Sequence, residues 1–414
     1  MRTIRIGLLL GLRQIQRANI WTNILIIFVM TLTFLNLIAV SGLLVGLIVG
    51  SERAFREQSI GDVLISAKPE ERTILGTQEI VRMLETYPEI QSYTVRYIEG
   101  AQAEANYKER RDLRAERDVV NTRLRGIDPL VEDATTGLSK RIVEGSYLDP
   151  NDEGKILVGS YTLEKYASGF GDVFDTMSNV SIGDSIRVTV GDASKEFIVK
   201  GVVQSKVEDV SMGMFIPEKE FRRVFGRVDR NADQISIRMK PDVSEDVLKA
   251  SLVESGIERH AKVETFAEGT PKFLTDIKNT FNLLGTFIGS IGLIVASITI
   301  FIIIFINALS RRRHIGILKA VGIERSVIEL AYVTQAAFYA ITGSLIGAAI
   351  TYGFLVPFFD ANPINFPFSD GILVVETMST ITRTLTLFVI TLIAGFVPAW
   401  IIARQNTLNA ILGR

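Results

Sequence analysis

The sequence contains no cysteine and only two histidines, His260 and His314. The absence of cysteine excludes a disulfide framework, thiol catalysis and a zinc–thiolate centre. Two histidines leave little basis for a histidine-based metal site. The net charge of −1 gives no indication of nucleic-acid binding.

Motifs that carry catalysis are also missing. The chain has no G-x-S-x-G nucleophile turn, no H-E-x-x-H zinc helix and no G-x-x-x-x-G-K-[ST] phosphate loop. Acidic pairs such as Asp152/Glu153 and Glu208/Asp209 are interpreted as a solvated surface, because carboxylates are frequent throughout this region. We therefore expect no enzyme activity, bound cofactor or metal in this chain.

Long apolar runs are what the sequence does have. Hydrophobic residues make up 47% of the chain and charged residues 22%, which indicates membrane spans together with a folded soluble domain. Four runs reach the length of about 20 residues that a bilayer core requires. The sequence therefore predicts a membrane protein with four transmembrane α-helices and a large extracytoplasmic mixed α/β domain inserted between helices 1 and 2.

Basic residues flanking these runs set the expected orientation. The loop between spans three and four has no lysine or arginine, and Arg383 at the outer edge of span four is interpreted as a side chain that extends to the interface. The basic residues gather before span one and between spans two and three: Arg2, Arg5, Arg13, Arg17, Arg311, Arg312, Arg313, Lys319 and Arg325. Both termini are therefore expected in the cytoplasm.

This topology divides the chain into nine segments. They are a cytoplasmic interfacial helix (1–19), span one (20–50), the extracytoplasmic domain (51–277), span two (279–309), a cytoplasmic segment (310–329), span three (330–356), an extracytoplasmic loop (357–383), span four (384–403) and a cytoplasmic tail (404–414). Span one is too long for a signal peptide, so it is expected to be an uncleaved anchor. The N-terminal segment, with Ile4, Leu8, Leu12 and Ile15 on one helical face, either lies in the inner interface or continues span one.

The extracytoplasmic segment shows both strand and helix patterns. The stretch "SIRVTVGDASKEFIVKGVVQS" predicts two strands joined by a turn at Gly191-Asp192. "PEKEFRRVFG" predicts a helix that begins at Pro217 and ends at Gly226. "DVSEDVLKASLVESG" predicts a second helix, opened by a capping box of Asp242 and Glu245.

Glycines recur at four-residue spacing in three of the spans, which lets helix backbones approach closely in lipid. They are Gly42, Gly46 and Gly50 in span one, Gly285 and Gly289 in span two, and Gly343 and Gly347 in span three. Two interpretations remain open: a face for dimerisation, or packing among the four helices of one chain.

Residues 310–329, "SRRRHIGILKAVGIERSVIE", separate spans two and three on the expected cytoplasmic side. Ile315, Leu318 and Val321 give a short helix one apolar edge, and Gly322 ends it. Such an edge either inserts into a groove of a soluble partner or belongs to a simple positively charged anchor. The residues alone do not separate these alternatives.

The same stretch resembles the coupling segment of permeases in the MacB/LolC/FtsX class of ATP-binding-cassette (ABC) systems. The shared pattern is Ile-Gly-Ile-Leu-[Lys/Arg]-Ala-hydrophobic-Gly, present here from Ile315 to Gly322. His314 departs from the family, which usually has an acidic residue there. "TRLRGIDPLV", "SIGDSIRVTV" and "FIVKGVV" are similar to motifs of the family's periplasmic domain. At the C-terminus "PAWIIARQNTLNAIL" is similar to the family ending, but Thr407-Leu408-Asn409-Ala410-Ile411 replaces its usual Pro-[Ile/Leu]-Glu-Ala-[Leu/Ile].

The resemblance implies a permease subunit in the bacterial inner membrane, paired with a second permease copy or paralogue. Two copies of a separate ABC ATPase subunit would bind ATP and magnesium and dock on the coupling segment. The implied contact residues are Ile315, Gly316, Leu318, Lys319, Val321 and Gly322. Further implied partners are membrane lipid and a periplasmic adaptor or lipoprotein chaperone, with no nucleic acid.

Two functions fit this class. The first is mechanotransmission, in which ATP hydrolysis moves the extracytoplasmic domain to release lipoproteins or export a lipid, peptide or drug. The alternative is signalling of the FtsX type, in which that domain activates a cell-wall hydrolase and nothing is transported. The large extracytoplasmic segment favours transport, because the signalling branch typically has a smaller one.

Overall fold

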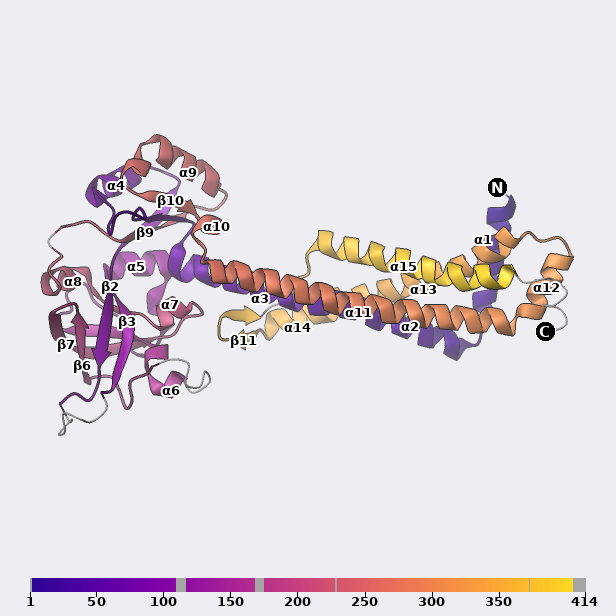
Figure 1. Ribbon diagram of the computed structural model, residues 1–414, viewed down its shortest axis with the longest axis horizontal. Helices are drawn as coiled ribbons and strands as arrows, with labels where there is room; N and C mark the ends of the chain where they lie inside the picture. The colour runs from indigo at the N-terminus through magenta and orange to yellow at the C-terminus, as the bar shows by residue number, and fades with distance from the viewer. Residues whose placement is uncertain (1, 109–116, 168–174, 228, 372, 405–414) are drawn as a thin grey trace. The chain divides into compact units, whose positions relative to one another are not determined.

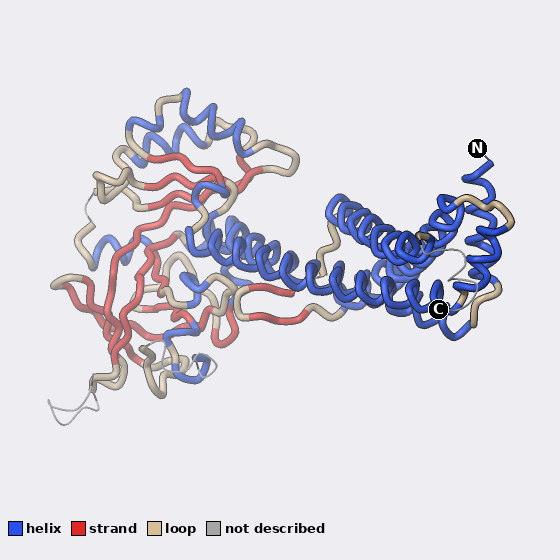
Figure 2. Tube along the Cα trace, turned by 45° about the vertical axis from the view of Figure 1, so that its right-hand side comes forward, coloured by secondary structure: helices blue, strands red, loops and turns tan. Residues whose placement is uncertain are grey.

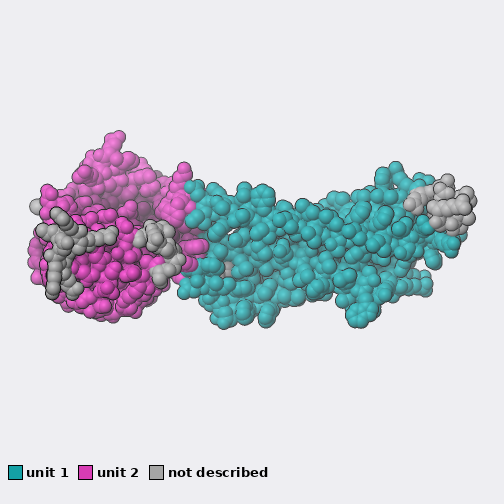
Figure 3. Space-filling model, turned by 60° about the horizontal axis from the view of Figure 1, so that its bottom comes forward, with its two compact units in different colours: residues 1–49, 276–366, 370–414 teal, residues 50–275, 367–369 magenta. Residues whose placement is uncertain are grey.

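The computed structural model describes residues 2–108, 117–167, 175–227, 229–371 and 373–404. These residues form two compact units, coloured separately in Figure 3. Unit 1 comprises residues 1–49, 276–366 and 370–414, and unit 2 comprises residues 50–275 and 367–369. Almost all strands belong to unit 2, whereas unit 1 is helical apart from one small hairpin (Figure 2).

Within the described residues, four helical stretches are long and apolar enough to cross a membrane: Ile20–Ile60, Lys272–Ser310, Arg325–Ala361 and Thr377–Ala403. The expectation of four such helices is confirmed. Each helix extends beyond the predicted span. The spans were predicted from apolar residues, and polar turns such as 377–383 are helical although they are not hydrophobic. The predicted loop 357–383 is correspondingly shorter.

The helical elements are labelled in Figure 1. Those of the long stretches and their connections are α1 (Arg2–Gln16), α2 (Ile20–Leu35), η1 (Asn36–Val40), α3 (Ser41–Phe55), η2 (Arg56–Ile60), α11 (Lys272–Ser310), α12 (Arg312–Ala320), α13 (Arg325–Ile350), η7 (Thr351–Leu355), α14 (Val356–Ala361) and α15 (Thr377–Ala403), with the hairpin β11 (Ile364–Phe366) and β12 (Ser369–Gly371). The η1, η2 and η7 segments are π-helical turns.

Helix α1 is a separate element. It ends at Gln16, and the side chain of Asn19 caps the start of α2 by accepting a hydrogen bond from the Trp21 amide at 3.0 Å. The alternative that the N-terminal segment simply continues span one is therefore wrong.

Close approaches between helices hold unit 1 together. A Cβ on Gly343 would collide with Met30 of α2, and one on Gly347 would lie 2.5 Å from the Phe34 ring. Gly42 faces Leu373, while Gly285 and Gly289 face Leu44 and Leu37 at ordinary contact distance. Gly46 is also buried, as is Gly50, the first residue of unit 2. Five of the seven predicted glycines thus face their own chain, as the intramolecular alternative expects, and a dimer face stays a prediction.

Arg383 does not extend to the interface as expected. Its guanidinium donates a hydrogen bond of 3.0 Å to the carbonyl of Leu37 in η1 and another to the hydroxyl of Ser41. Its Nε donates to Ser379 at 3.1 Å. A half-buried guanidinium needs acceptors, and the π turn of the first long helix supplies one.

Unit 2 is built on a mixed sheet of ten strands in the order β10-β1-β9-β2-β3-β8-β5-β7-β4, with β6 pairing β2 and β7. The strands are β1 (Val63–Ser66), β2 (Ile90–Glu104), β3 (Val119–Ile127), β4 (Ile142–Gly145), β5 (Lys155–Gly159), β6 (Ser185–Val190), β7 (Ala193–Val203), β8 (Met214–Pro217), β9 (Gln234–Met239) and β10 (Lys262–Thr265). The first half of β2 pairs with β9 and its second half pairs with β3 and β6. One strand therefore joins both halves of the unit.

Each half of the sheet has its own helices and core. Around β1, β9 and β10 lie α4 (Thr77–Leu84) and α9 (Glu245–Glu254), which pack a core of residues such as Ile80, Leu252 and Ile237. The other half carries the remaining helical segments: α5 (Pro129–Thr136), η3 (Leu138–Arg141), η4 (Ser160–Thr162), α6 (Glu164–Ala167), α7 (Glu208–Ser211) and α8 (Glu218–Val224). The segments η6 (Ile257–Arg259) and α10 (Phe266–Gly269) flank β10.

Several sequence predictions for unit 2 are confirmed. Strands β6 and β7 form the predicted hairpin, with Val190 paired to Ala193 across the turn. Helix α8 starts directly after Pro217, and Gly256, with φ of +86°, follows the end of α9. The predicted capping box is wrong, because Ser244 precedes α9 and Asp242 lies in the turn before it with φ of +69°.

A buried ion pair connects four segments of unit 2. Arg96 of β2 and Glu132 of α5, whose side chains are 4% and 2% exposed, form two hydrogen bonds of 2.7 and 2.9 Å. Arg96 also donates to the carbonyl of Ser59 at 2.7 Å and to Ser236 of β9 at 3.1 Å. Glu132 accepts further bonds from the hydroxyls of Thr94 and Thr136. Burial alone raises the pKa of Glu132, but the Arg96 charge and these hydrogen bonds hold it below its ordinary value.

Ser59 belongs to the π turn η2, and the two residues before it also form hydrogen bonds with other segments of unit 2. The Glu57 carbonyl accepts from Arg238 at 3.1 Å, and the Gln58 side chain accepts from the Ser205 hydroxyl at 2.7 Å. Gly61 then takes φ of +79°, where a Cβ would lie 2.5 Å from the Ile237 carbonyl, so only glycine fits. The end of the helical stretch Ile20–Ile60 is thus fixed to both halves of the sheet.

We expect Glu132→Gln to destabilise unit 2 by about 3–5 kcal/mol, because it leaves the buried Arg96 charge without its counter-ion. Thermal unfolding of the full-length protein, with hydrogen exchange of β2 and α5 peptides, measures this. The matched control is Glu144→Gln, which removes an exposed pair with Lys165 and should cost less than about 1 kcal/mol.

The pH dependence follows from the depressed pKa of Glu132. Its stabilising contribution is complete above the unfolded-state value of 4.5 and is lost as the pH falls through the lower folded-state pKa. The wild type should therefore lose this part of its stability below about pH 4.5, and Glu132→Gln should not. Parallel acid-unfolding curves for the two proteins would contradict this account.

Gly343→Ala should loosen the packing of α13 on α2, since the added methyl group collides with Met30. We expect a loss of about 1–3 kcal/mol in unfolding free energy in detergent, typical of overpacking. Gly353→Ala is the control, because among the described residues no heavy atom beyond its chain neighbours and its own helix backbone lies within 4 Å of its Cβ position. Equal effects of the two substitutions would argue against a close approach at Gly343.

Candidate functional site

The segment between α11 and α13 forms a short helix with a defined end. Arg311 leaves helical geometry with φ of −101° and ψ of 11°, and α12 then runs from Arg312 to Ala320. The Ile323 amide donates to the Leu318 carbonyl at 3.0 Å, and the Gly322 amide donates to Lys319 at 3.1 Å. This pair of bonds is a Schellman motif, and Gly322 takes the positive φ of +95° that the motif requires.

The expected apolar edge of α12 is divided between the interior and the surface. Ile315 is 3% exposed and packs in the core of unit 1 with Ile328 and Ala403, and Gly316 is also buried. Leu318 is half-buried. The exposed apolar side chains are Ile317 at 53% and Val321 at 78%. Spacing along the sequence predicted the helix but not this orientation, because the adjacent helices decide which side is covered.

Lys319 is bonded within the chain. Its ammonium group donates a hydrogen bond of 2.9 Å to the carbonyl of Ala403, the last residue of α15. A cation on the unpaired carbonyls of a helix end is favourable both as a hydrogen bond and through the helix dipole. Partial burial and the nearby Arg325 charge lower the pKa of Lys319. Lys319 therefore ties α12 to α15, and its expected contact with an ATPase subunit stays a prediction.

Helix α1 lies against the start of α13. Gly7 and Gly11 allow this approach, since a Cβ on Gly7 would lie 2.7 Å from Leu330 and one on Gly11 would lie 2.7 Å from the Ala331 carbonyl. Ile4, Leu8 and Leu12 stay largely exposed, which suits a helix in the membrane interface. The Gly7–Gly11 spacing was not among the predicted packing glycines, although "GLLLG" carries the same four-residue signal.

Polar side chains reinforce the contacts of α1 and α2 with α13. Tyr339 donates to the Asn23 side chain at 2.6 Å, and the Asn23 amide donates to the Ile15 carbonyl at 2.9 Å. Gln335 donates to Gln14. Hydrogen bonds of this kind stabilise helix association in lipid. The predicted tail residues from Thr407 to Ile411 lie outside the described part of the chain.

Comparison with known proteins finds a family that matches the helical C-terminal part of this chain. Residues 286–407 match the family model of the FtsX-like permease C-terminal domain, which covers most of α11 together with α12, α13 and α15. Two curated relatives are the "Probable export ATP-binding/permease protein MacB" of Pseudomonas entomophila, 26% identical over 49% of this chain, and the "Macrolide export ATP-binding/permease protein MacB" of Campylobacter jejuni, 25% identical over 53% of it. The matches span 30% and 34% of those relatives' lengths.

Two solved structures are also similar. The periplasmic region of MacB from Actinobacillus actinomycetemcomitans covers 52% of this chain and 97% of its own, at 16% identity and a TM-score of 0.36. The extracellular domain of the ABC-type transporter YknZ from Gram-positive bacteria covers 49% of this chain and 99% of its own, at 13% identity and a TM-score of 0.33.

The residues that match the FtsX-like permease domain include α13, α15 and most of α11, which belong to three of the four apolar helical stretches. The chain is therefore similar to permeases of the MacB/FtsX type of ABC system, and the motif from Ile315 to Gly322 lies within the matched residues.

Lys319→Met should free the end of α15, because it removes the cation that caps the Ala403 carbonyl. We expect amide exchange near residues 400–404 to accelerate by about tenfold, because the variant loses one charge-assisted hydrogen bond that contributes about 1.5 kcal/mol. Hydrogen-exchange mass spectrometry on the full-length protein measures it. Arg313→Gln, on the exposed part of the same helix, should leave exchange in this region unchanged. Equal exchange rates in the two variants would contradict the role of the Lys319–Ala403 hydrogen bond.

Proposed function

We propose that the chain is the permease subunit of an ABC system of the mechanotransmission type, with α12 as the docking element for a separate ATPase subunit. The match of residues 286–407 to the FtsX-like permease domain supports the proposal, because α12 lies within the matched residues, between α11 and α13. In this proposal both termini and α12 are cytoplasmic, and residues 51–277 lie outside an inner membrane. The basic residues around α1 and α12 support this orientation.

The proposed docking surface is the exposed side of α12. Ile317 and Val321 are four residues apart and so lie on one helical face. Two exposed apolar side chains at this spacing suit insertion of a short helix into a groove of a soluble partner. Arg313 and Arg325 are exposed nearby in the sequence and favour an acidic rim around that groove.

The inward residues of α12 provide the route for a displacement. Ile315 packs against α13 and α15, and Lys319 holds the end of α15. A closely packed cluster does not deform continuously, so movement of α12 would move the ends of both helices with it. Ile315 and Lys319 are thus positioning residues, and Ile317 and Val321 are the proposed contacts.

Helix length supports transmission across the bilayer. Helix α11 has 39 residues, which at 1.5 Å per residue is about 58 Å, compared with a hydrocarbon core of about 30 Å. We expect the excess to project beyond the membrane as a stalk. The extracytoplasmic domain would then receive movement through two continuous helical stretches.

Export of a lipid, peptide or drug, or release of a lipoprotein, is the proposed outcome. The relatives' names refer to export, and one is named for export of macrolides. Signalling to a cell-wall hydrolase is the alternative outcome of the same architecture, and the proteins that purify with the permease distinguish the two.

Affinity purification from native membranes in mild detergent, followed by mass spectrometry, tests the proposal. The wild type should recover an ABC ATPase subunit, and Ile317→Asp with Val321→Asp should lose it while inserting normally in the membrane, because a charged face no longer enters an apolar groove. A loss of tenfold or more corresponds to about 1.4 kcal/mol or more of binding energy.

The matched control is Val247→Asp, an exposed apolar residue on α9 of unit 2, which should keep the ATPase. Retention of the ATPase by the α12 double variant would overturn the docking assignment. Recovery of lipid or lipoprotein cargo supports export, whereas recovery of a cell-wall hydrolase without cargo supports signalling.

A further inference from the structure

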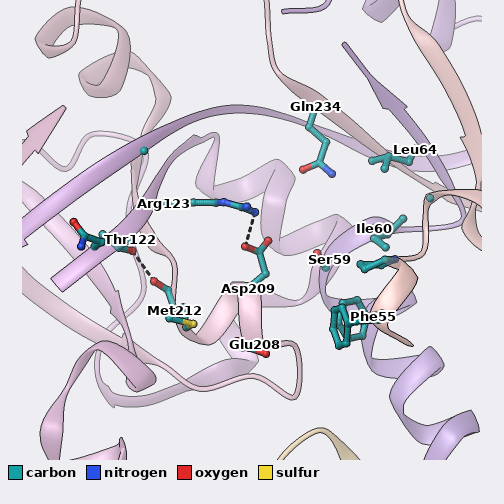
Figure 4. Close-up of a pocket in the computed structure, with 15 residues that line it drawn as sticks. Phe55, Ser59, Ile60, Leu64, Thr122, Arg123, Glu208, Asp209, Met212 and Gln234 are labelled. Carbon is teal, nitrogen blue, oxygen red and sulfur yellow. Dashed lines mark hydrogen bonds and ion pairs between the residues drawn. The ribbon is translucent and has the colours of Figure 1, made fainter. Parts of the chain in front are cut away.

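Unit 2 contains a cavity of about 800 Å³, a volume within the range of small-molecule sites (Figure 4). Its walls come from segments far apart in sequence: the end of α3 and η2, the strands β1 and β3, the helix α7, and residues 269–273. All of them belong to unit 2, so the cavity is a property of that unit. No residue of α12 lines it.

One wall of the cavity is apolar. Phe55, Ile60 and Leu64 line it, and Figure 4 shows them across the cavity from Arg123. Phe273 adds an aromatic ring that packs edge-to-face on Phe55, with ring centroids 6.1 Å apart and an interplanar angle of 66°. Phe273 is 47% exposed although it is a large apolar side chain. This wall can take up an apolar or aromatic group of a ligand.

The opposite wall is charged. Arg123 donates to Asp209 at 3.0 Å, a bond drawn in Figure 4, and the buried Arg125 donates to the same carboxylate. Asp209 therefore has two arginine counter-ions. Glu208, the neighbouring residue on α7, also lines the cavity, and it is exposed with no ion-pair partner among the described residues. The carboxylate that lacks a counter-ion is thus Glu208.

From this juxtaposition we propose that the cavity binds a compact amphipathic cation, with its apolar body on the Phe55–Phe273 wall and its positive charge at Glu208. An aromatic wall favours the same ligands, because ring faces attract cations. Glu208 is exposed, as the sequence interpretation expected, and Asp209 is ion-paired with Arg123 and Arg125. As a statement about the class of exported cargo, the inference rests on the proposed function; as a statement about binding, it does not.

Tetraphenylphosphonium and tetraphenylborate test the proposal, because they have the same shape and opposite charge. Equilibrium dialysis against the full-length protein in nanodiscs, corrected with empty nanodiscs for lipid partition, should show saturable binding of tetraphenylphosphonium and weaker binding of tetraphenylborate. Glu208→Gln should weaken tetraphenylphosphonium binding about fivefold, the effect of one partly exposed ion pair. The control Glu79→Gln, at an exposed carboxylate on α4 outside the cavity, should change nothing.

Phe273→Ala should weaken binding of both ions, because it removes apolar wall without changing charge. Both side chains are exposed, so neither substitution disturbs the core. Absence of saturable binding, or tetraphenylphosphonium binding that Glu208→Gln leaves unchanged, would overturn the proposal. The measurement contains no ATPase subunit, so its failure would leave the docking assignment of α12 intact, and loss of the docking assignment would leave ligand binding intact.

Discussion

The hydrogen-bonded pair of Arg96 and Glu132 is the constraint on which unit 2 depends. Moving two charges out of water costs several kcal/mol per ion, and the cost is offset only where every donor and acceptor finds a partner. Here the Arg96 guanidinium meets a carboxylate, a backbone carbonyl and a hydroxyl, and the carboxylate accepts from two threonines as well. An apolar pair of similar volume could fill this space, but it would not specify the register of four segments at once.

Unit 1 is held together by a different set of interactions. If its helices lie in lipid, no hydrophobic force separates helix contacts from lipid contacts, so close approach and polar ties must hold the bundle together. Gly343 and Gly347 bring α13 onto α2, and the Tyr339–Asn23 hydrogen bond fixes the rotation of one helix against the other. Since α12 is joined to this bundle by Ile315 and Lys319, it is a part of the packed unit and not a loose connection.

How far the sequence predicts this structure depends on the range of the interactions involved. The long apolar runs, the hairpin around Gly191 and the helix end at Gly322 follow from local patterns, and the structure has all three. The partner of Lys319 and two acceptors of Arg383, Leu37 and Ser41, lie 84 or more residues away in sequence, and the core around Ile315 includes Ala403 of α15; no local pattern encodes such contacts. The pocket around Glu208 was missed for the same reason: its apolar wall comes from both ends of unit 2.

In both π turns of the first long helical stretch, a backbone carbonyl accepts a hydrogen bond from an arginine of another element. In η1 the Leu37 carbonyl accepts from Arg383, and in η2 the Ser59 carbonyl accepts from Arg96. A π turn inserts one residue into the helical repeat and disturbs the regular bonding of its carbonyls, so outside donors can reach them. An arginine supplies such a donor with a fixed geometry and a permanent charge. A shift of this helix along its axis would have to break both bonds, whereas a shift of helix and donors together breaks neither. Each bond therefore holds the helical stretch to an element of its own unit, to α15 in unit 1 and to β2 in unit 2.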